Sequence, residues 1–160
     1  MEEDISRELE RIEEDAKYSS KGHFEAASTW RHCNYWLGVP SAIGAGAAGV
    51  AAFNDLVLVS GIVAVCVAAL TSVSTFLDPS ARANAHRISG ASFLALKNQA
   101  RILRTVDLKS GDATVTQRFR ELAERRDTLN SDCPEIPTMA YKRAKAGIER
   151  GEADHKVDGR

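Results

Sequence analysis

The chain has 160 residues, of which 44% are hydrophobic and 27% charged, and its formal net charge at pH 7 is −1. This length allows a single domain. The apolar residues are concentrated in the middle and the charges at the ends, which excludes the even amphipathic spread of a soluble globular chain. Three cysteines, odd in number and widely spaced, exclude a disulfide framework and indicate a reducing interior.

Charge is distributed unevenly along the chain. Residues 1–34 carry 9 acidic and 5 basic side chains, residues 78–160 carry 12 and 16, and Asp55 is the only charged residue between them. A charged segment of about 35 residues, with no basic start, precedes the apolar region, so that region is not a signal peptide. The sequence therefore predicts polar helical regions over 1–35 and 78–150 around a membrane-embedded segment over 36–77.

Residues 2–35 are predicted to form one long helix whose apolar positions recur at alternating spacings of four and three, which is a heptad seam. The seam positions are Ile5, Leu9, Ile12, Ala16, Ser19, His23, Ala26 and Trp30. The seam weakens in its middle, where serine and histidine occupy it. Two partners for it remain open, namely the protein's own C-terminal part and the same helix of other subunits.

An uncharged transmembrane hairpin is predicted to follow. Its two apolar runs, 37–53 and 56–77, are separated only by Asn54-Asp55. As helices they would span about 26 and 33 Å, against a bilayer core of about 30 Å. Pro40 either starts the first helix or kinks it. The aromatic residues expected at one headgroup layer are Trp30, Tyr35, Trp36 and Phe76.

The orientation of the hairpin follows from its flanks. The outer turn has no Lys or Arg, whereas both flanking segments have several. Positive residues stay on the cytoplasmic side, so both termini are predicted to lie in the cytoplasm.

The first span is rich in small residues, which let helices approach closely in lipid. They form two rows spaced by four, Gly38-Ala42-Gly46 and Ser41-Ala45-Gly49, which face either the second span or another subunit. The run from Gly44 to Gly49 also reads GxGxxG. A dinucleotide site requires a preceding strand and an acidic residue about 20 positions later, so this motif is rejected.

The second span carries a mildly polar stripe at spacings of four and three. Its members are Ser60, Ala64, Val67, Thr71 and Ser74. Either its hydroxyls bond to their own helix backbone, as is common in lipid, or the stripe lines a narrow pore.

A pore would need more than one copy of the chain. One hairpin cannot enclose water, so it would require a symmetric homo-oligomer of four or more copies. Asp55 would then ring the outer mouth and Asp78 the inner mouth, and acidic rings favour cations.

Residues 78–150 are predicted to form cytoplasmic helices, and 151–160 a disordered tail. Asp78 is a plausible N-cap with Pro79 at the first helical position, and this helix should run to about Val106. Later boundaries are a break at Gly111, a cap at Asp112 for a helix to about Leu129, and Pro134 and Pro137 before a helix over about 138–150.

The helix that begins after Asp78 has two contrasting faces on a 3.6-residue period. The apolar face consists of Ile88, Ala91, Ala95, Ile102 and Val106. The opposite, basic face consists of the predicted ligand-binding residues Arg82, His86, Phe93, Lys97, Arg101 and Arg104. Three uses of the basic face remain open: a solvated surface, contact with anionic lipid headgroups, and binding of a phosphate-bearing ligand through arginine and aromatic stacking.

The sequence offers no catalytic constellation, so an enzyme is not predicted, and neither is a cofactor. The histidines are scattered, and no phosphate-binding loop precedes a helix with a lysine. Cys33 lies next to His32, but no second Cys/His pair occurs at zinc spacing, so no metal site is predicted.

Three runs of sequence resemble the SLATT domain family. They are WLGVPSAIGAGAAGVAAF, AALTSVSTFLDPSARANAHRISGASFLALKNQARIL and PEIPTMAYKRAKAGI, and the resemblance covers roughly residues 5–150. It is most specific from Leu70 to Leu103, where the helix end, the DPS turn and the AHR segment match together. Such proteins are bacterial, with two transmembrane helices, and belong to immunity systems that signal through nucleotides. The resemblance implies a pore-forming effector and a partner nucleotidyltransferase that makes its messenger.

The leading hypothesis is therefore an all-α, oligomeric membrane channel controlled by a nucleotide or oligonucleotide bound on its basic cytoplasmic helices. The alternative is a non-selective membrane-disrupting or scaffold protein whose basic helix binds anionic lipid. A third hypothesis, a soluble bundle with the hairpin as its core, is disfavoured by two uncharged helices of this length.

Overall fold

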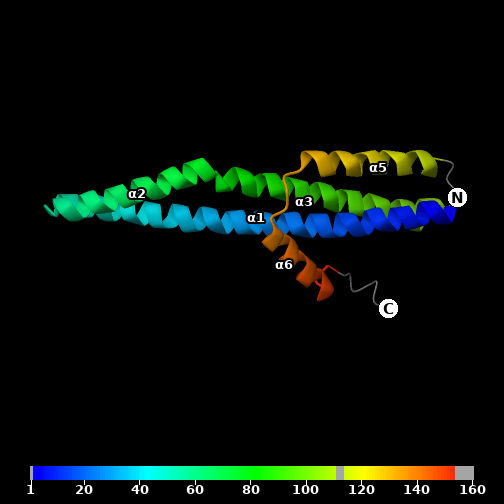
Figure 1. Ribbon diagram of the computed structural model, residues 1–160, viewed down its shortest axis with the longest axis horizontal. Helices are drawn as coiled ribbons and strands as arrows, with labels where there is room; N and C mark the ends of the chain where they lie inside the picture. Colours follow the sequence, from blue (N-terminus) through cyan, green and yellow to red (C-terminus); the bar gives the residue numbers. More distant parts are fainter. Residues whose placement is uncertain (1, 111–113, 154–160) are drawn as a thin grey trace. The chain divides into compact units, whose positions relative to one another are not determined.

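The computed structural model describes residues 2–110 and 114–153, and within these ranges the chain is helical with no strand. The elements are α1 (Glu2–Phe53), α2 (Val57–Leu77), α3 (Pro79–Ile102), the π-helical turn η1 (Leu103–Asp107), α4 (Leu108–Ser110), α5 (Val115–Asp132) and α6 (Thr138–Glu149) (Figure 1). The all-helical prediction is confirmed. The predicted break at Gly111 and cap at Asp112 lie outside the described residues, as do residues 154–160 of the predicted tail.

The chain divides into two compact units. The hairpin unit is Ser28–Ala83, and the core unit combines Met1–Ala27 with Asn84–Arg160. The division therefore leaves about two further helical turns of each flanking helix with the hairpin, compared with the predicted segment 36–77.

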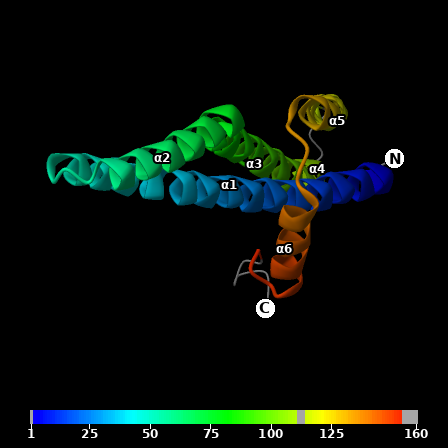
Figure 2. The same ribbon diagram turned by 60° about the vertical axis from the view of Figure 1, so that its left-hand side comes forward.

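The core unit is built on the predicted heptad seam of α1. In both ribbon views α3 lies alongside the N-terminal part of α1, with α5 and α6 on opposite sides of this pair (Figures 1 and 2). The buried apolar cluster consists of Leu9, Ile12, Ala16, Phe93, Leu96, Ala100, Leu103, Val115 and Leu122. Of the two partners left open for the seam, the chain's own C-terminal part is thus the one observed.

The face assignment of α3 is wrong in the prediction. The side that faces the core carries His86, Phe93, Leu96, Lys97, Ala100 and Leu103, all buried. The side predicted to be the apolar packing face is outward, with Ile88 53%, Ile102 48% and Val106 59% exposed. Both stripes have helical spacing, and the one with Phe93, Leu96 and Leu103 buries more apolar area against the α1 seam.

The hairpin unit consists of the C-terminal part of α1, a short turn, α2 and the first residues of α3. Helix α1 passes through Pro40 without ending, so the predicted N-terminal helix and the predicted first span are one helix of 52 residues. Pro40 therefore does not start a helix, although it leaves one backbone hydrogen bond unmade. The predicted turn is confirmed at Asn54 and Asp55, where Asp55 has a φ of 58° and the Asn54 amide caps the Val50 carbonyl at 2.8 Å.

The junction between α2 and α3 is the predicted Asp78-Pro79 cap. Asp78 has a left-handed backbone that ends α2, and its carboxylate accepts a hydrogen bond of 3.1 Å from the Ala81 N–H. Pro79 occupies the first position of α3, where its missing N–H costs nothing. One residue therefore closes one helix and opens the next.

The chain end that follows α6 differs from the predicted tail. Gly151 has a φ of 78°, its N–H bonds to the Ile148 carbonyl at 2.9 Å, and the Glu152 N–H bonds to the Gly147 carbonyl at 3.1 Å. These two bonds form a Schellman motif, in which a left-handed glycine ends a helix. Residues 151–153 are therefore an ordered helix-capping turn and not part of a disordered tail.

Candidate functional site

The hairpin unit contains an intrachain seam and an exposed apolar surface. Gly44 lies so close to α2 that an added Cβ would be 2.6 Å from a methyl of Val67, and the Ser60 hydroxyl donates to the Ala48 carbonyl at 3.0 Å. Beyond this seam no residue of α2 is buried, and an added Cβ at Gly38, Gly46 or Gly49 would meet nothing within 4 Å. The Gly38–Ala42–Gly46 row is therefore open to a partner other than α2.

The predicted pore stripe is divided between the seam and the surface. Ser60, Val67 and Ser74 are half-buried, whereas Ala64 and Thr71 are exposed. Because Ser60 and Val67 contact α1, they are not free to face a pore in this hairpin. The Ser60 hydroxyl bonds to α1 and not to its own helix. Own-helix bonding is seen outside the stripe, at Ser72 and Thr75, whose hydroxyls donate to the Ala68 and Thr71 carbonyls at 2.8 and 2.9 Å. The pore role of the stripe stays a prediction.

The two predicted mouth residues sit at the two ends of α2. Asp55 is exposed in the outer turn. Asp78 is also exposed, but its carboxylate already serves as the helix cap of α3. Asp55 is thus the less constrained acid, and ring formation by either residue stays a prediction.

The six predicted ligand-binding residues do not form one surface. Arg82 belongs to the hairpin unit, where its guanidinium lies 5.0 Å from the Trp30 ring centroid and its Nε donates to the Leu77 carbonyl at 2.7 Å. The other five belong to the core unit. Arg104 donates to the Glu13 carboxylate at 3.0 Å and thereby ties η1 to α1, while Arg101 is half-buried.

His86 and Phe93 are core residues, which corrects their predicted role as stacking platforms. They are 4% and 3% exposed, so a base cannot reach their rings. His23 lies between them, with its Nδ1 3.0 Å from the His86 Nδ1 and its ring stacked on Phe93 at a centroid distance of 5.5 Å. Because two Nδ1 atoms share this hydrogen bond, one of them must donate and the other accept, so both nitrogens cannot carry a proton.

The electrostatics of this histidine pair agree with its geometry. Burial, together with the neighbouring His86, lowers the pKa of His23 to about 4. His23 is therefore neutral at pH 7 and supplies no positive charge for a ligand.

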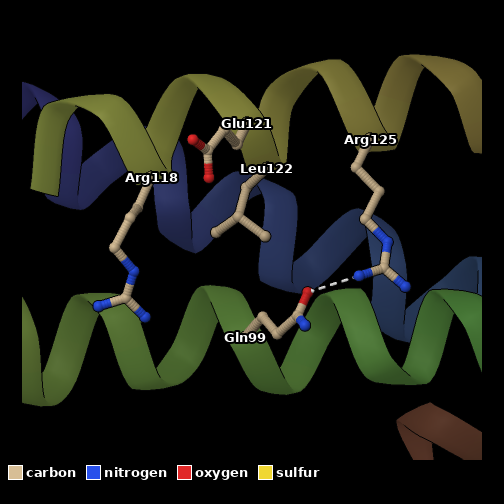
Figure 3. A pocket seen from close by; sticks show the side chains of 5 residues that line it. All are labelled: Gln99, Arg118, Glu121, Leu122 and Arg125. Atoms are coloured by element: carbon tan, nitrogen blue, oxygen red, sulfur yellow. Dashed lines mark hydrogen bonds between the residues drawn. The ribbon is translucent and has the colours of Figure 1, made fainter. Parts of the chain in front are cut away.

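Two shallow cationic pockets occur in the core unit. The first, of about 240 Å³, lies between α3 and α5 and is lined by Gln99, Arg118, Glu121, Leu122 and Arg125. Arg118 and Arg125 reach toward α3 on either side of Leu122, and the Arg125 guanidinium donates to the Gln99 side chain at 3.0 Å (Figure 3). Arg118 is also paired with Asp107. Its arginines are therefore already engaged, one of them by a carboxylate.

The second pocket, of about 280 Å³, is formed by α1, α3 and the turn after α6. Its lining residues are Lys17, Ser20, Lys21, Phe24, Leu94, Lys97, Glu152 and Ala153. Lys97 is the only one of the six predicted ligand residues that lines it. Sequence reasoning missed Lys17, Lys21 and Phe24, although their spacings of four and three place them on one helix face beside the seam.

No protein-family model, no curated protein and no solved structure matches the chain.

Proposed function

We propose that the chain is an oligomeric, pore- or channel-forming effector of the bacterial inner membrane, controlled by a nucleotide second messenger that a partner enzyme makes. The hairpin unit spans the bilayer and both termini are cytoplasmic. Four or more copies assemble around an axis, and the core unit binds the messenger. The bacterial setting, antiphage immunity and the partner nucleotidyltransferase come from the resemblance to the SLATT domain family.

The observation that carries this proposal is that α2 is uncharged and left exposed by the rest of the chain. It has 21 residues without a charge, and none is buried by the rest of the chain. Two helices are long and apolar enough to cross a membrane. In water such a surface would be strongly unfavourable at about 25 cal/mol for each Å² of apolar area, whereas lipid removes that cost.

The need for several copies follows from the open small-residue row. Gly38 and Gly46 have open space around them, and small residues are the usual contact points between helices in lipid. A second chain packed there would place hairpins side by side, which is the arrangement that a central pathway requires.

The test is ion flux from liposomes that contain the purified chain, with and without cyclic and linear oligonucleotides. The proposal predicts flux of small ions that changes on addition of one nucleotide, with retention of large dyes. Conversion of Gly46 to Leu should abolish flux, while the matched change at Gly61, also in open space but on α2, should not. Flux that ignores every nucleotide would contradict messenger control.

A second candidate, a membrane-disrupting or scaffold protein, is favoured by the outward face of α3. There the exposed Ile88, Ile102 and Val106 are accompanied by the exposed Arg87, a combination that suits an anionic lipid surface. Leakage of large dyes without a defined single-channel conductance would favour this candidate over a pore.

A further inference from the structure

The lysine pocket, formed by Lys17, Lys21 and Lys97 with Phe24 and Leu94, contains a lysine that is not paired with a carboxylate. Lys97 is 9% exposed, and within the described residues no hydrogen bond or ion pair joins it to another group. Its hydrocarbon stem is buried while its Nζ keeps access to the pocket, where it can meet solvent or a bound anion. Lys97 lines the pocket together with two more lysines from α1, so the pocket is a concentrated source of positive charge.

Among the described residues, Glu152 is the one carboxylate that lines this pocket. Lys21 Nζ lies 3.1 Å from one Glu152 oxygen, and Arg150 donates to the other at 2.9 Å. These two hydrogen bonds, that of Arg150 above all, lower the pKa of Glu152, so this side chain is an anion at pH 7. The pocket therefore already holds one negatively charged group in contact with a lysine.

The backbone conformation places the Glu152 carboxylate beside Lys21. The Schellman motif at Gly151 folds the chain back over the end of α6, which brings residue 152 beside Gly147. An added Cβ at Gly147 would lie 2.6 Å from Glu152 Oε2 and 3.4 Å from Lys21 Cε. The missing side chain at position 147 is thus what leaves room for the carboxylate.

The remaining walls fit a planar group. Phe24 lies against Gly90, where an added Cβ would be 3.1 Å from the ring, and it remains 36% exposed. A ring with one face on the protein and part of its surface open offers a platform for a nucleobase. A volume of about 280 Å³ is at the lower edge of small-molecule sites, so it would hold part of a nucleotide.

We infer that the lysine pocket binds a phosphate group of a nucleotide, with its base against Phe24, and that the Glu152 carboxylate is a built-in competitor for the same lysines. Ligand binding then displaces the turn at residues 150–153. The identity of this ligand as the messenger rests on the proposed function, whereas binding of the anion and its competition with Glu152 do not.

The experiment is calorimetric titration of the full chain in an uncharged detergent with ADP, and with pyrophosphate as a probe that lacks the base. Lys97→Met should weaken ADP binding about tenfold or more, a loss typical for removal of a partner from a charged contact. Lys109→Met, which removes an exposed lysine from α4, is the matched control and should stay within about twofold of the parent chain.

Two substitutions test the competitor while all three lysines are kept. Glu152→Gln removes the competing charge, and Gly147→Ala evicts the carboxylate while adding a residue that helices favour. Each should tighten binding of ADP and pyrophosphate by about three- to tenfold. Phe24→Leu should weaken ADP binding and leave pyrophosphate binding unchanged.

Three outcomes would overturn the inference. They are parental affinity in Lys97→Met, no binding of either probe in Glu152→Gln, and unchanged affinity in both Glu152→Gln and Gly147→Ala. Circular dichroism verifies that each variant is folded. If Lys97→Met fails to fold, Glu152→Gln and Gly147→Ala still test the competition. Anion binding without an effect of any nucleotide on liposome flux would contradict the proposed function and leave this inference standing.

Discussion

The hairpin unit and the core unit bury their apolar residues in opposite ways. The core unit is rich in charged residues, yet it encloses a continuous cluster in which Leu9, Leu96 and Ala100 have no exposed surface. The hairpin unit is nearly free of charge, yet Leu58 is 78% exposed and Phe53 92%. The difference teaches that the two units are built for different surroundings, because a large apolar surface left uncovered by the rest of the chain must be covered by lipid or by another protein surface. The proposed function assigns it to lipid.

The largest expected effect is a matched pair of leucine truncations. Leu96→Ala, in the core unit, should lower the free energy of unfolding by about 2–5 kcal/mol because it leaves a cavity in close-packed surroundings. Leu58→Ala, in the hairpin unit, should change it by less than about 0.5 kcal/mol. Chemical unfolding in mild detergent, followed by circular dichroism, measures both. Equal losses would mean that the exposed leucine is covered in the native protein.

Introducing a charged residue into each unit tests the same difference between the hairpin unit and the core unit. Val65→Arg places a cation near the centre of α2, at a cost to membrane insertion of about 2.5–3.5 kcal/mol. Ile88→Arg, at a position 53% exposed in the core unit, should leave insertion unchanged. Alkaline extraction of membranes shows the fraction of each variant that stays inserted. The contrast between the units would fail if Val65→Arg stayed inserted as well as Ile88→Arg.

Acid should affect the core unit through the buried histidine pair. The pKa of His23 is lowered to about 4 in the folded chain, from an ordinary value of 6.5, so the unfolded chain binds more protons between these pH values. The contribution of His23 to stability is therefore fully present above pH 6.5, decreases as the pH falls toward 4, and its loss below that amounts to at most about 3 kcal/mol, at about 1.4 kcal/mol for each pKa unit.

The measurement is the unfolding midpoint at pH 7 and pH 4.5, in the parent chain and in His23→Gln. The variant should lose this part of the pH dependence. His32→Gln is the control, since His32 is exposed and bonded within its own helix turn to Ser28. A pH dependence that survives in His23→Gln and disappears in His32→Gln would contradict the assignment.

The smallest effect concerns the seam between α1 and α2 in the hairpin unit. The Ser60 hydroxyl crosses to the Ala48 carbonyl, and side-chain hydrogen bonds between membrane helices contribute about 0.6 kcal/mol on average. Ser60→Ala should cost about that much. Ser72→Ala removes only a bond within α2 and should cost less. The same unfolding assay ranks the two, and a larger loss at Ser72 would argue against the seam.

Much of the fold was predictable because local signals were strong and unopposed. The two uncharged runs, the Asn54-Asp55 turn and the Asp78-Pro79 cap each depend on neighbouring residues alone. The seam of α1 was predictable for the same reason, since Leu9, Ile12 and Ala16 keep one period.

The site was less predictable because it depends on tertiary competition. Helix α3 carries two apolar stripes, and only the shape of the α1 seam decides that Phe93 rather than Ile88 faces inward. Pro40 left two outcomes open, a helix start or a kink, since a proline inside a long helix has the same local signal as a helix start. The lysine pocket combines α1, α3 and the turn after α6. Its contact between Lys21 and Glu152 joins residues that are 131 positions apart in the sequence. Residues Arg150-Gly151-Glu152 do carry the signal of a glycine helix stop, which could have identified the turn.

The most direct test of the difference between the two units is thiol labelling in liposomes. Cys66 is exposed on α2 in the isolated chain, so a chain with Cys33 and Cys133 replaced by serine reports its surroundings through one thiol. The account predicts that a membrane-impermeant maleimide leaves Cys66 unmodified. In a cysteine-free background the same reagent should label a cysteine placed at Asn54 in vesicles whose hairpin turns face outward. Labelling of Cys66 as fast as the turn position would show that water reaches α2, and would contradict a hairpin embedded in lipid.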